Sequence, residues 1–298
     1  MSDTTANLQR KLASAQDLLA VVRTMKALAA SSIGQYEDSV RALGDYYRTV
    51  ELGLSVCFRY HQPSSAGLLH SVKASDQSVG VVVFGSDQGL VGQFNEQVVD
   101  SVTSFLAGLP TDRVQVWAVG ERVGARLVDT GVLTEQLFSV PNSVQTIAPL
   151  VGEILLATDR ERVPGEMAEL HLFYNRSQSG ASYEPVRHRL LPLDAVWRRE
   201  LAELRWPSDS LPEVQGDNIA SLGALIREYL FISLFRACAE SLASENASRL
   251  AAMQRAERNI DELLEQLRGT FHRIRQSGID EELFDVVAGF DALASEAD

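Results

Sequence analysis

The residues with the clearest potential for chemistry form a glycine-rich turn, which runs from Gly85 to Asn95 and reads Gly-Ser-Asp-Gln-Gly-Leu-Val-Gly-Gln-Phe-Asn. It follows a β-branched run and precedes a segment with helical spacing, so its backbone N–H groups are candidates for binding a phosphate. The glycine spacing fits neither GxGxxG nor GxxxxGK[ST], and no lysine is near. We therefore favour a structural turn, in which Gly89 and Gly92 permit close helix–sheet packing and Asp87 and Asn95 act as caps.

The histidines and cysteines provide no second candidate centre. The five histidines show neither HExxH nor i,i+4 spacing, and His171 and His188 lie in strand-like runs, where a structural role is more common. Cys57 and Cys238 are the only cysteines, and both fall within helical patterns. The sequence therefore predicts no catalytic residue, no cofactor and no metal site, and the cysteine usage points to a reducing, cytoplasmic setting.

The glycine-rich turn belongs to a middle region that alternates strands and helices. Three β-branched or apolar runs predict buried strands, and they cover residues 79–84, 114–119 and 169–174. Helical spacing covers residues 95–109, a second helix is expected within 144–157, and residues 186–193 are a candidate for one more strand. This order predicts βαβ units and a largely parallel sheet in a domain spanning residues 75–205.

Both ends of the chain carry heptad-type apolar stripes. In the N-terminal stripe the steps alternate between four and three residues, with one break at Lys26, where Met25 lies beside the seam. The seam positions are Leu8, Leu12, Ala15, Leu19, Val22, Ala29, Ile33, Tyr36, Val40, Leu43, Tyr47, Val50 and Leu54. The C-terminal stripe is clearest at Leu250, Met253, Ile260, Leu264, Leu267, Phe271 and Ile274. A period of 3.5 residues predicts coiled-coil helices, and a helix over residues 4–58 would be about 80 Å long.

The predicted fold class is α/β, with a long antiparallel two-helix coiled coil formed by the two termini and a Rossmann-like α/β domain inserted between them. The predicted domains are an N-terminal helix in 1–60, the α/β domain in 75–205 and a C-terminal helix in 213–298. The stripes alone leave open whether the coil closes on itself or joins another chain.

Composition narrows the range of partners. The 298 residues carry a net charge of −13, and residues 213–298 hold 16 Asp and Glu against 8 Arg. Nucleic-acid binding is not expected, because it needs clustered basic residues. The first residues have no secretory pattern, and no run of about 20 apolar residues predicts a membrane span. The acidic end is either a solvated surface or an electrostatic face toward a partner.

Three blocks of sequence together resemble the γ subunit of F-type ATP synthases. The C-terminal block, from Glu240 to Met253 and then from Arg275 to Gly289, is similar to the family pattern ASEQAARMxAM…RQAxITxELxEIVxGA. The N-terminal segment from Lys11 to Ser31 resembles KIxSVxNTxKITKAMxMVAASK, and the turn from Ser86 to Asn95 resembles SDRGLCGGFN. The resemblance covers almost the whole chain.

The resemblance implies a central-stalk rotor that couples transmembrane ion flow, of protons or sodium, to ATP synthesis or hydrolysis. Its partners would be the α and β subunits of the catalytic hexamer, the ε subunit and the membrane c-ring, and the chain itself would be non-catalytic. Matching family positions suggest shaft–hexamer contacts at Arg23, Met25, Arg249, Gln276 and Glu282. The alternatives are a stand-alone coiled-coil scaffold and an enzyme that uses the glycine-rich turn.

Several positions depart from the family pattern. Asp280 replaces the usual Thr, Gln88 replaces Arg, and the apolar segment 17–22 replaces NTQKIT. These departures and the net charge suggest a divergent branch of the family, for example a second ATPase that pumps sodium or protons. The lack of a transit-peptide pattern and of a cysteine-bearing regulatory insert favours a bacterial source. The expected location is the cytoplasmic face of the bacterial inner membrane, with the chain peripheral to it.

Overall fold

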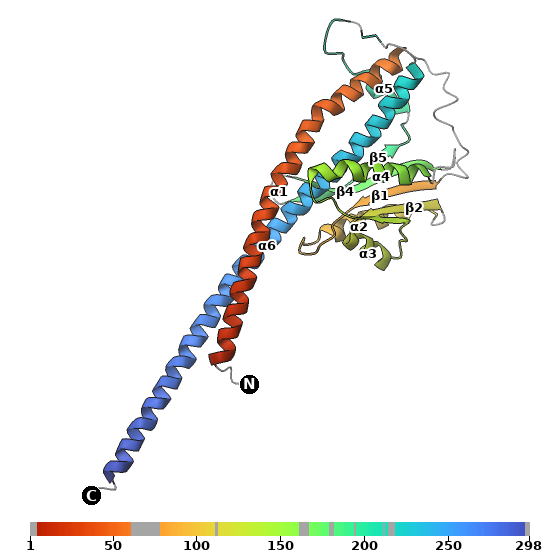
Figure 1. Cartoon of the computed structure of the whole chain (residues 1–298). Coiled ribbons are helices and arrows are strands. Elements are labelled where there is room, and N and C mark those ends of the chain that lie inside the picture. Colours follow the sequence, from red (N-terminus) through yellow and green to blue (C-terminus); the bar gives the residue numbers. More distant parts are fainter. Residues whose placement is uncertain are drawn as a thin grey trace. The chain divides into compact units, whose positions relative to one another are not determined.

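A computed structural model describes residues 5–60, 78–110, 113–160, 167–178, 182–193, 195–210, 212–213 and 218–295. The two ends form long helices, α1 (Thr5–Tyr60) and α6 (Asn218–Ser295), and a sheet lies between them in the sequence (Figure 1). The chain divides into two compact units. Residues 1–28 and 250–298 make up the first, here called the helical unit, and residues 29–249 make up the second, called the sheet unit.

The predicted seam of α1 is the buried side of that helix. Every seam position from Leu8 to Leu54 is buried or half-buried, and most of the residues between them are exposed. In the helical unit, Leu19 packs in one cluster with Leu264 of α6, and in the sheet unit the ring centroids of Tyr47 and Tyr229 lie 5.7 Å apart. Further along α1, Arg23 pairs with Glu257 and Gly53 lies beside Leu225, so residue numbers rise along α1 as they fall along α6 in each unit. The pair is therefore antiparallel and closes within the chain, which confirms the predicted coiled coil.

The sheet has five strands in the order β3-β2-β1-β4-β5. They are β1 (Ser78–Phe84), β2 (Val114–Val119), β3 (Gln136–Phe138), β4 (Met167–Ser177) and β5 (Tyr183–Leu191). The first four are parallel to their neighbours, and β5 pairs with β4 in antiparallel orientation. This confirms the four predicted strands. The sequence did not predict β3, because three residues are too short to show a strand pattern.

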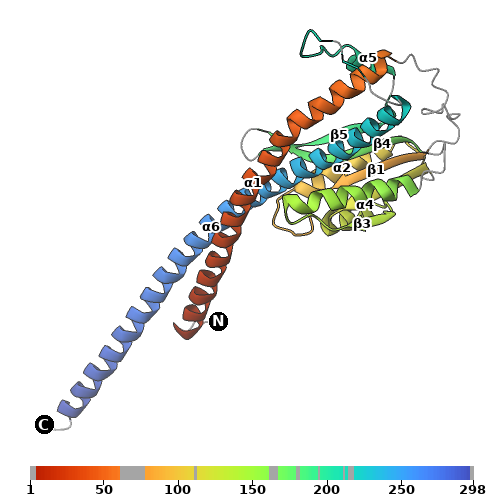
Figure 2. The same cartoon turned by 45° about the horizontal axis from the view of Figure 1, so that its top comes forward.

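Helices cover both faces of the sheet. On one face lie α2 (Phe94–Leu106) and α3 (Glu121–Asp129), whose buried valines and leucine pack on Val81 and Val83 of β1. On the other face lie α4 (Ile147–Arg160) and the part of α6 that belongs to the sheet unit (Figure 2). Successive residues of a strand point to opposite faces, so β1 contributes to both layers. A short 3₁₀ turn, η3 (Val144–Thr146), precedes α4, and α5 (Ala195–Ala202) follows the sheet.

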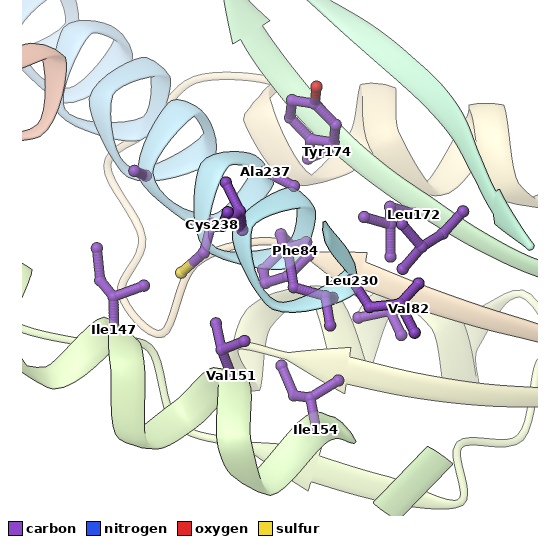
Figure 3. Packing of buried hydrophobic residues seen from close by; sticks show 14 of the residues in the cluster. Val82, Phe84, Ile147, Val151, Ile154, Leu172, Tyr174, Leu230, Ala237 and Cys238 are labelled. Atoms are coloured by element: carbon purple, nitrogen blue, oxygen red, sulfur yellow. The ribbon is translucent and has the colours of Figure 1, made fainter. Parts of the chain in front are cut away.

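The largest core joins three elements that are distant in sequence. Figure 3 shows Ile147, Val151 and Ile154 of α4 pointing toward Phe84 of β1, with Cys238 on the adjacent surface of α6. Cys57 and Cys238 are both buried and free. The helices at 95–109 and within 144–157 are thus confirmed as α2 and α4. Helix α3 was not predicted, because it has only nine residues, although its buried Val123 and Leu127 have the i, i+4 spacing of a helix.

The predicted domain limits stay a prediction, and residue 75 lies outside the described residues. Within the described part of the chain, no helix is both long and apolar enough to cross a bilayer.

Candidate functional sites

The glycine-rich turn is held by its own side chains. The Ser86 amide donates to Asn95 Oδ1 at 3.0 Å, and Asn95 Nδ2 donates to Ser86 Oγ at 2.8 Å. The amide of Glu121, at the start of α3, donates to Asp87 Oδ1 at 2.9 Å, and the Val140 amide donates to Oδ2 at the same distance. An internal carboxylate thus occupies the N-terminus of α3, where an anion is favoured. Asp87 has a capping role, although it caps α3 and not α2. The prediction that Asn95 caps a helix is wrong, because Asn95 lies inside α2 and its side chain binds Ser86 of the turn.

Close packing near this turn occurs at Gly85 and Gly120. A Cβ on Gly85 would lie 2.3 Å from Val123 Cβ, and one on Gly120, at φ +117°, would lie 2.8 Å from the Ser86 carbonyl oxygen. Gly92, at φ +60°, fits the predicted tight turn, whereas a Cβ on Gly89 would meet only Arg122 Nη2, at 3.9 Å. The prediction of close packing at Gly89 is therefore wrong.

The same turn is attached to α6 through buried polar groups. Ser248 Oγ donates to the Val91 carbonyl. The next residue, Arg249, pairs through Nη2 with Glu245 Oε1, one helical turn earlier, at 2.6 Å. Burial raises the pKa of Glu245, although Arg249 opposes the shift, and the nearby Asp87 raises it further. Arg249, one of the predicted contact residues, has only 13% of its side chain exposed. It is already part of the internal packing of the sheet unit.

Arg23, in the helical unit, is also engaged by α6. Its Nε lies 2.9 Å from Glu257 Oε1 and its Nη2 lies 3.8 Å from Asp261 Oδ1. Lys26 pairs with the other oxygen of Glu257. Hydrogen bonds from Lys26 and Arg23 hold the pKa of Glu257 below its usual value. Met25, the neighbouring predicted contact residue, is half-buried.

Gln276 and Glu282 lie on a different kind of surface. Every residue from Arg275 to Val287 is exposed, and this segment of α6 is called the tip below. Large apolar side chains on the tip are 49% to 71% exposed, and they are Ile279, Leu283, Phe284, Val286 and Val287. Ile279, Leu283 and Val286 share one helix face, because they follow the i, i+4, i+7 spacing. An apolar helix face of this kind marks a surface for binding another chain.

A partly buried ionic cluster around Glu240 was not predicted from the sequence. Glu240 of α6 accepts from Arg236 Nε at 2.7 Å and from Arg176 Nε of β4 at 2.9 Å, and Arg176 also donates to the Tyr174 hydroxyl. Burial opposes ionisation of Glu240, but the hydrogen bonds from Arg236 and Arg176 outweigh it, so its pKa lies below the usual value. The Arg236–Glu240 spacing of i,i+4 was a visible signal, whereas the pairing with Arg176 depends on the fold. The cluster fastens α6 to the sheet.

The described residues therefore offer two kinds of feature: polar networks that bind α6 to its own chain, and an exposed helix tip with apolar side chains. They hold no group of three or more His, Cys, Asp or Glu placed to bind a metal ion. Together, a helix pair and an α/β domain with these surfaces define a protein that acts by binding other chains along its helices.

Comparison with known proteins gives the family. A family model described as ATP synthase matches residues 4–293. The ATP synthase gamma chain of Syntrophus aciditrophicus is 29% identical over 292 residues, which cover 97% of this chain and 98% of the relative. That of Kineococcus radiotolerans is 28% identical, with 96% of each chain covered.

Solved structures agree on the fold. A chain from the Euglena gracilis mitochondrial ATP synthase, OSCP/F1/c-ring in rotational state 3, has a TM-score of 0.62 at 17% identity. The alignment covers 99% of this chain and 96% of the other. A rotor chain of the same enzyme in rotational state 1 has a TM-score of 0.59 at 18% identity and covers 92% and 98%. The chain belongs to the ATP synthase γ-subunit family, as its sequence blocks suggested.

Proposed function

We propose that this chain is the central-stalk rotor subunit of a bacterial F-type ATP synthase or ATPase, and that it carries no catalytic centre of its own. The observation that carries the proposal is the family match across residues 4–293. The antiparallel helix pair and the inserted α/β domain support it, because the same arrangement occurs in chains from ATP synthase rotors.

The physical task of such a subunit is to transmit twist. A rotor must be stiff about its axis, and it must present different chemical surfaces around its circumference to the subunits that it drives. The narrow apolar seam binds the two helices to each other, and the exposed tip of α6 offers its apolar face to surrounding chains. Under this proposal the α and β subunits of the catalytic hexamer surround the tip, and they carry the nucleotides.

The inserted domain is assigned to the opposite task of attachment. We place the ε subunit and the membrane c-ring as its partners, with the chain peripheral to the cytoplasmic face of the bacterial inner membrane. The turn from Gly85 to Asn95 supports a structural role over an enzymatic one, because the side chains of Ser86, Asp87 and Asn95 are all used in hydrogen bonds within the domain.

Of the five proposed contact residues, Gln276 and Glu282 are the ones that lie on the fully exposed tip. Both are exposed on the tip, beside its apolar face. Met25 is half-buried in the helical unit, and Arg249 is mostly buried and paired with Glu245. Arg23 is 56% exposed, but its guanidinium is already paired with Glu257. We expect the hexamer contacts to concentrate on the tip.

Co-expression with the α, β and ε subunits of the same organism tests the assignment. The chain should purify in a complex that contains α and β in equal amounts and one copy of this chain for three copies of each. A stand-alone scaffold would purify without them, and micromolar binding of ATP or NAD to the isolated chain in titration calorimetry would favour the enzyme alternative.

A matched pair of variants tests the contact surface. Gln276→Ala should lower ATP-driven ion pumping per ATP hydrolysed, whereas Gln266→Ala should leave it unchanged. Gln266 is also exposed on α6 but lies in the part paired with α1. Equal pumping by both variants and the unmodified complex would remove Gln276 from the contact surface.

A further inference from the structure

The break in the N-terminal stripe has a partner on the other helix. Lys26 stands where the seam would otherwise carry an apolar residue, and its side chain is only 35% exposed. Glu257 of α6 lies opposite, with 18% of its side chain exposed. A charged pair therefore replaces an apolar layer within the seam of the helical unit.

Four side chains form this group, which we name the ionic clasp: Arg23, Lys26, Glu257 and Asp261. Both carboxylate oxygens of Glu257 are used, one by Lys26 Nζ and the other by Arg23 Nε. Arg23 also reaches Asp261 at 3.8 Å, so its guanidinium spans one turn of α6. All four residues belong to the helical unit.

The apolar seam beside the clasp carries little information about register. The cluster next to it consists of Leu19, Ala15 and Leu264, with Leu12 and Ile260 packed against it. Small and branched aliphatic side chains recur at heptad spacing on both helices, so a shift of one heptad would again bring apolar residues together. Taken by themselves, the apolar layers of the helical unit would therefore distinguish weakly between neighbouring pairings.

The clasp penalises those other pairings. A shift of one heptad in either direction would set Lys26 opposite Leu250 or Leu264, because Leu19 and Leu264 mark the present alignment. Glu257 would then face Leu19 or Ile33. Both charges would lose their partners against apolar side chains, which is a recognised way in which a polar seam residue selects one register.

We propose that the ionic clasp is the positioning element that fixes the register of α1 on α6 in the helical unit. Under this proposal Arg23 binds α6 of its own chain and does not make the hexamer contact that its family position suggested. The link to rotation rests on the proposed function: a register that cannot slip lets twist applied to α6 pass to α1 without loss.

Charge exchange in the full-length chain tests the clasp directly. Lys26→Glu sets two carboxylates against each other, and Glu257→Lys sets a lysine against Lys26 and Arg23, so each should speed amide hydrogen exchange of residues 8–28 several-fold. The double variant Lys26→Glu, Glu257→Lys rebuilds one pair and should restore slow exchange. Arg41→Glu, which breaks an exposed pair with Asp38 on α1, is the matched control and should not change exchange there.

A second variant separates register from simple attachment. The double variant Lys26→Leu, Glu257→Leu fills the seam with apolar side chains, so amide hydrogen exchange of residues 8–28 should stay slow. Because the charges no longer select one register, a second set of amide signals should appear from molecules in a shifted pairing. Unchanged exchange in the single variants, no restoration in the charge-exchanged double, or a single native set of signals in the leucine double would each overturn the proposal.

The assembled complex supplies the functional measurement. Glu257→Lys should lower ion pumping per ATP hydrolysed, and the charge-exchanged double should regain it. Since amide exchange is measured on the chain alone, failure of the clasp and failure of the rotor assignment give different results. A residue that acted only by touching the hexamer would not be rescued by a change on its own chain.

Discussion

The sheet unit and the helical unit are stabilised in different ways. The sheet unit buries whole side chains between layers, and Phe84, Trp117, Phe173 and Ile154 are all 1% exposed or less. The helical unit consists of two helix segments, whose buried residues lie along one narrow line, and its surface includes Leu18, Val21 and Leu28 at 55% to 64% exposure. Close packing of buried side chains fixes the geometry of the sheet unit, whereas an apolar seam and a few ion pairs fix that of the helical unit.

This difference matches the tasks that we assign to them. A layered core resists deformation in every direction, which suits a domain that must attach firmly to partners. A helix pair leaves most of its surface for contact with surrounding chains, at the cost of fewer internal contacts. Helix α6 belongs to both units, and in the sheet unit it is fastened by Glu240 and Ser248.

Phe84→Ala should have the largest effect on stability. The ring is 1% exposed in the core between β1, α4 and α6, so its removal leaves a cavity that the layers cannot close. We expect a loss of about 4 kcal/mol in the free energy of unfolding. Urea denaturation followed by circular dichroism gives the measurement. Leu133→Ala, at an 84% exposed position, is the control and should change stability by less than about 0.5 kcal/mol. Similar losses for both variants would contradict the layered core.

Leu264→Ala should have a smaller effect that stays within the helical unit. Leu264 is 3% exposed in the seam, whereas its neighbour Leu263 is 46% exposed on the same helix. Leu264→Ala should lower the free energy of local opening by about 3 kcal/mol, and Leu263→Ala by less than about 0.5 kcal/mol. Amide hydrogen exchange of residues 250–274 gives the measurement. Equal effects at both positions would mean that the seam is not where the structure places it.

Glu240→Ala should have the smallest of these effects, and it should depend on pH. The arginines that bind Glu240 are partly solvated, at 42% and 47% exposure, so we expect a loss of about 2 kcal/mol at neutral pH. Because the folded pKa of Glu240 is lowered, its contribution is complete above the unfolded pKa of about 4.3. It disappears as pH falls through the folded value.

Denaturant titrations of both proteins at neutral pH and near pH 3 give the measurement for Glu240. The difference in free energy of unfolding between wild type and variant should become smaller at the lower pH. A gap that widened would show that burial, and not the two arginines, dominates the ionisation of this carboxylate.

Periodicity in the sequence was enough to locate much of the fold. The seam from Leu8 to Leu54 depends on a spacing of 3.5 residues, and the strands at 79–84 and 114–119 depend on β-branched or apolar runs, which are local properties of the chain. The antiparallel order of the two ends was expected as the simplest geometry for such a pair of helices. The family blocks around Glu240 and Arg275 were likewise visible as continuous sequence. The sequence did not predict β3, because its three residues are too few to show a period. It did not predict α3 either, although Val123 and Leu127 have helical spacing, because that helix has only nine residues.

The sequence by itself determined which residues face a seam or a sheet, and the family to which the chain belongs. Only the tertiary structure decided which distant residue each of them meets. It paired Arg23 with Glu257, Arg176 with Glu240 and Asp87 with the start of α3, and it left the tip of α6 exposed. The physical reason is that burial follows from local periodicity, whereas a charge can be satisfied by any opposite charge that the fold brings within reach.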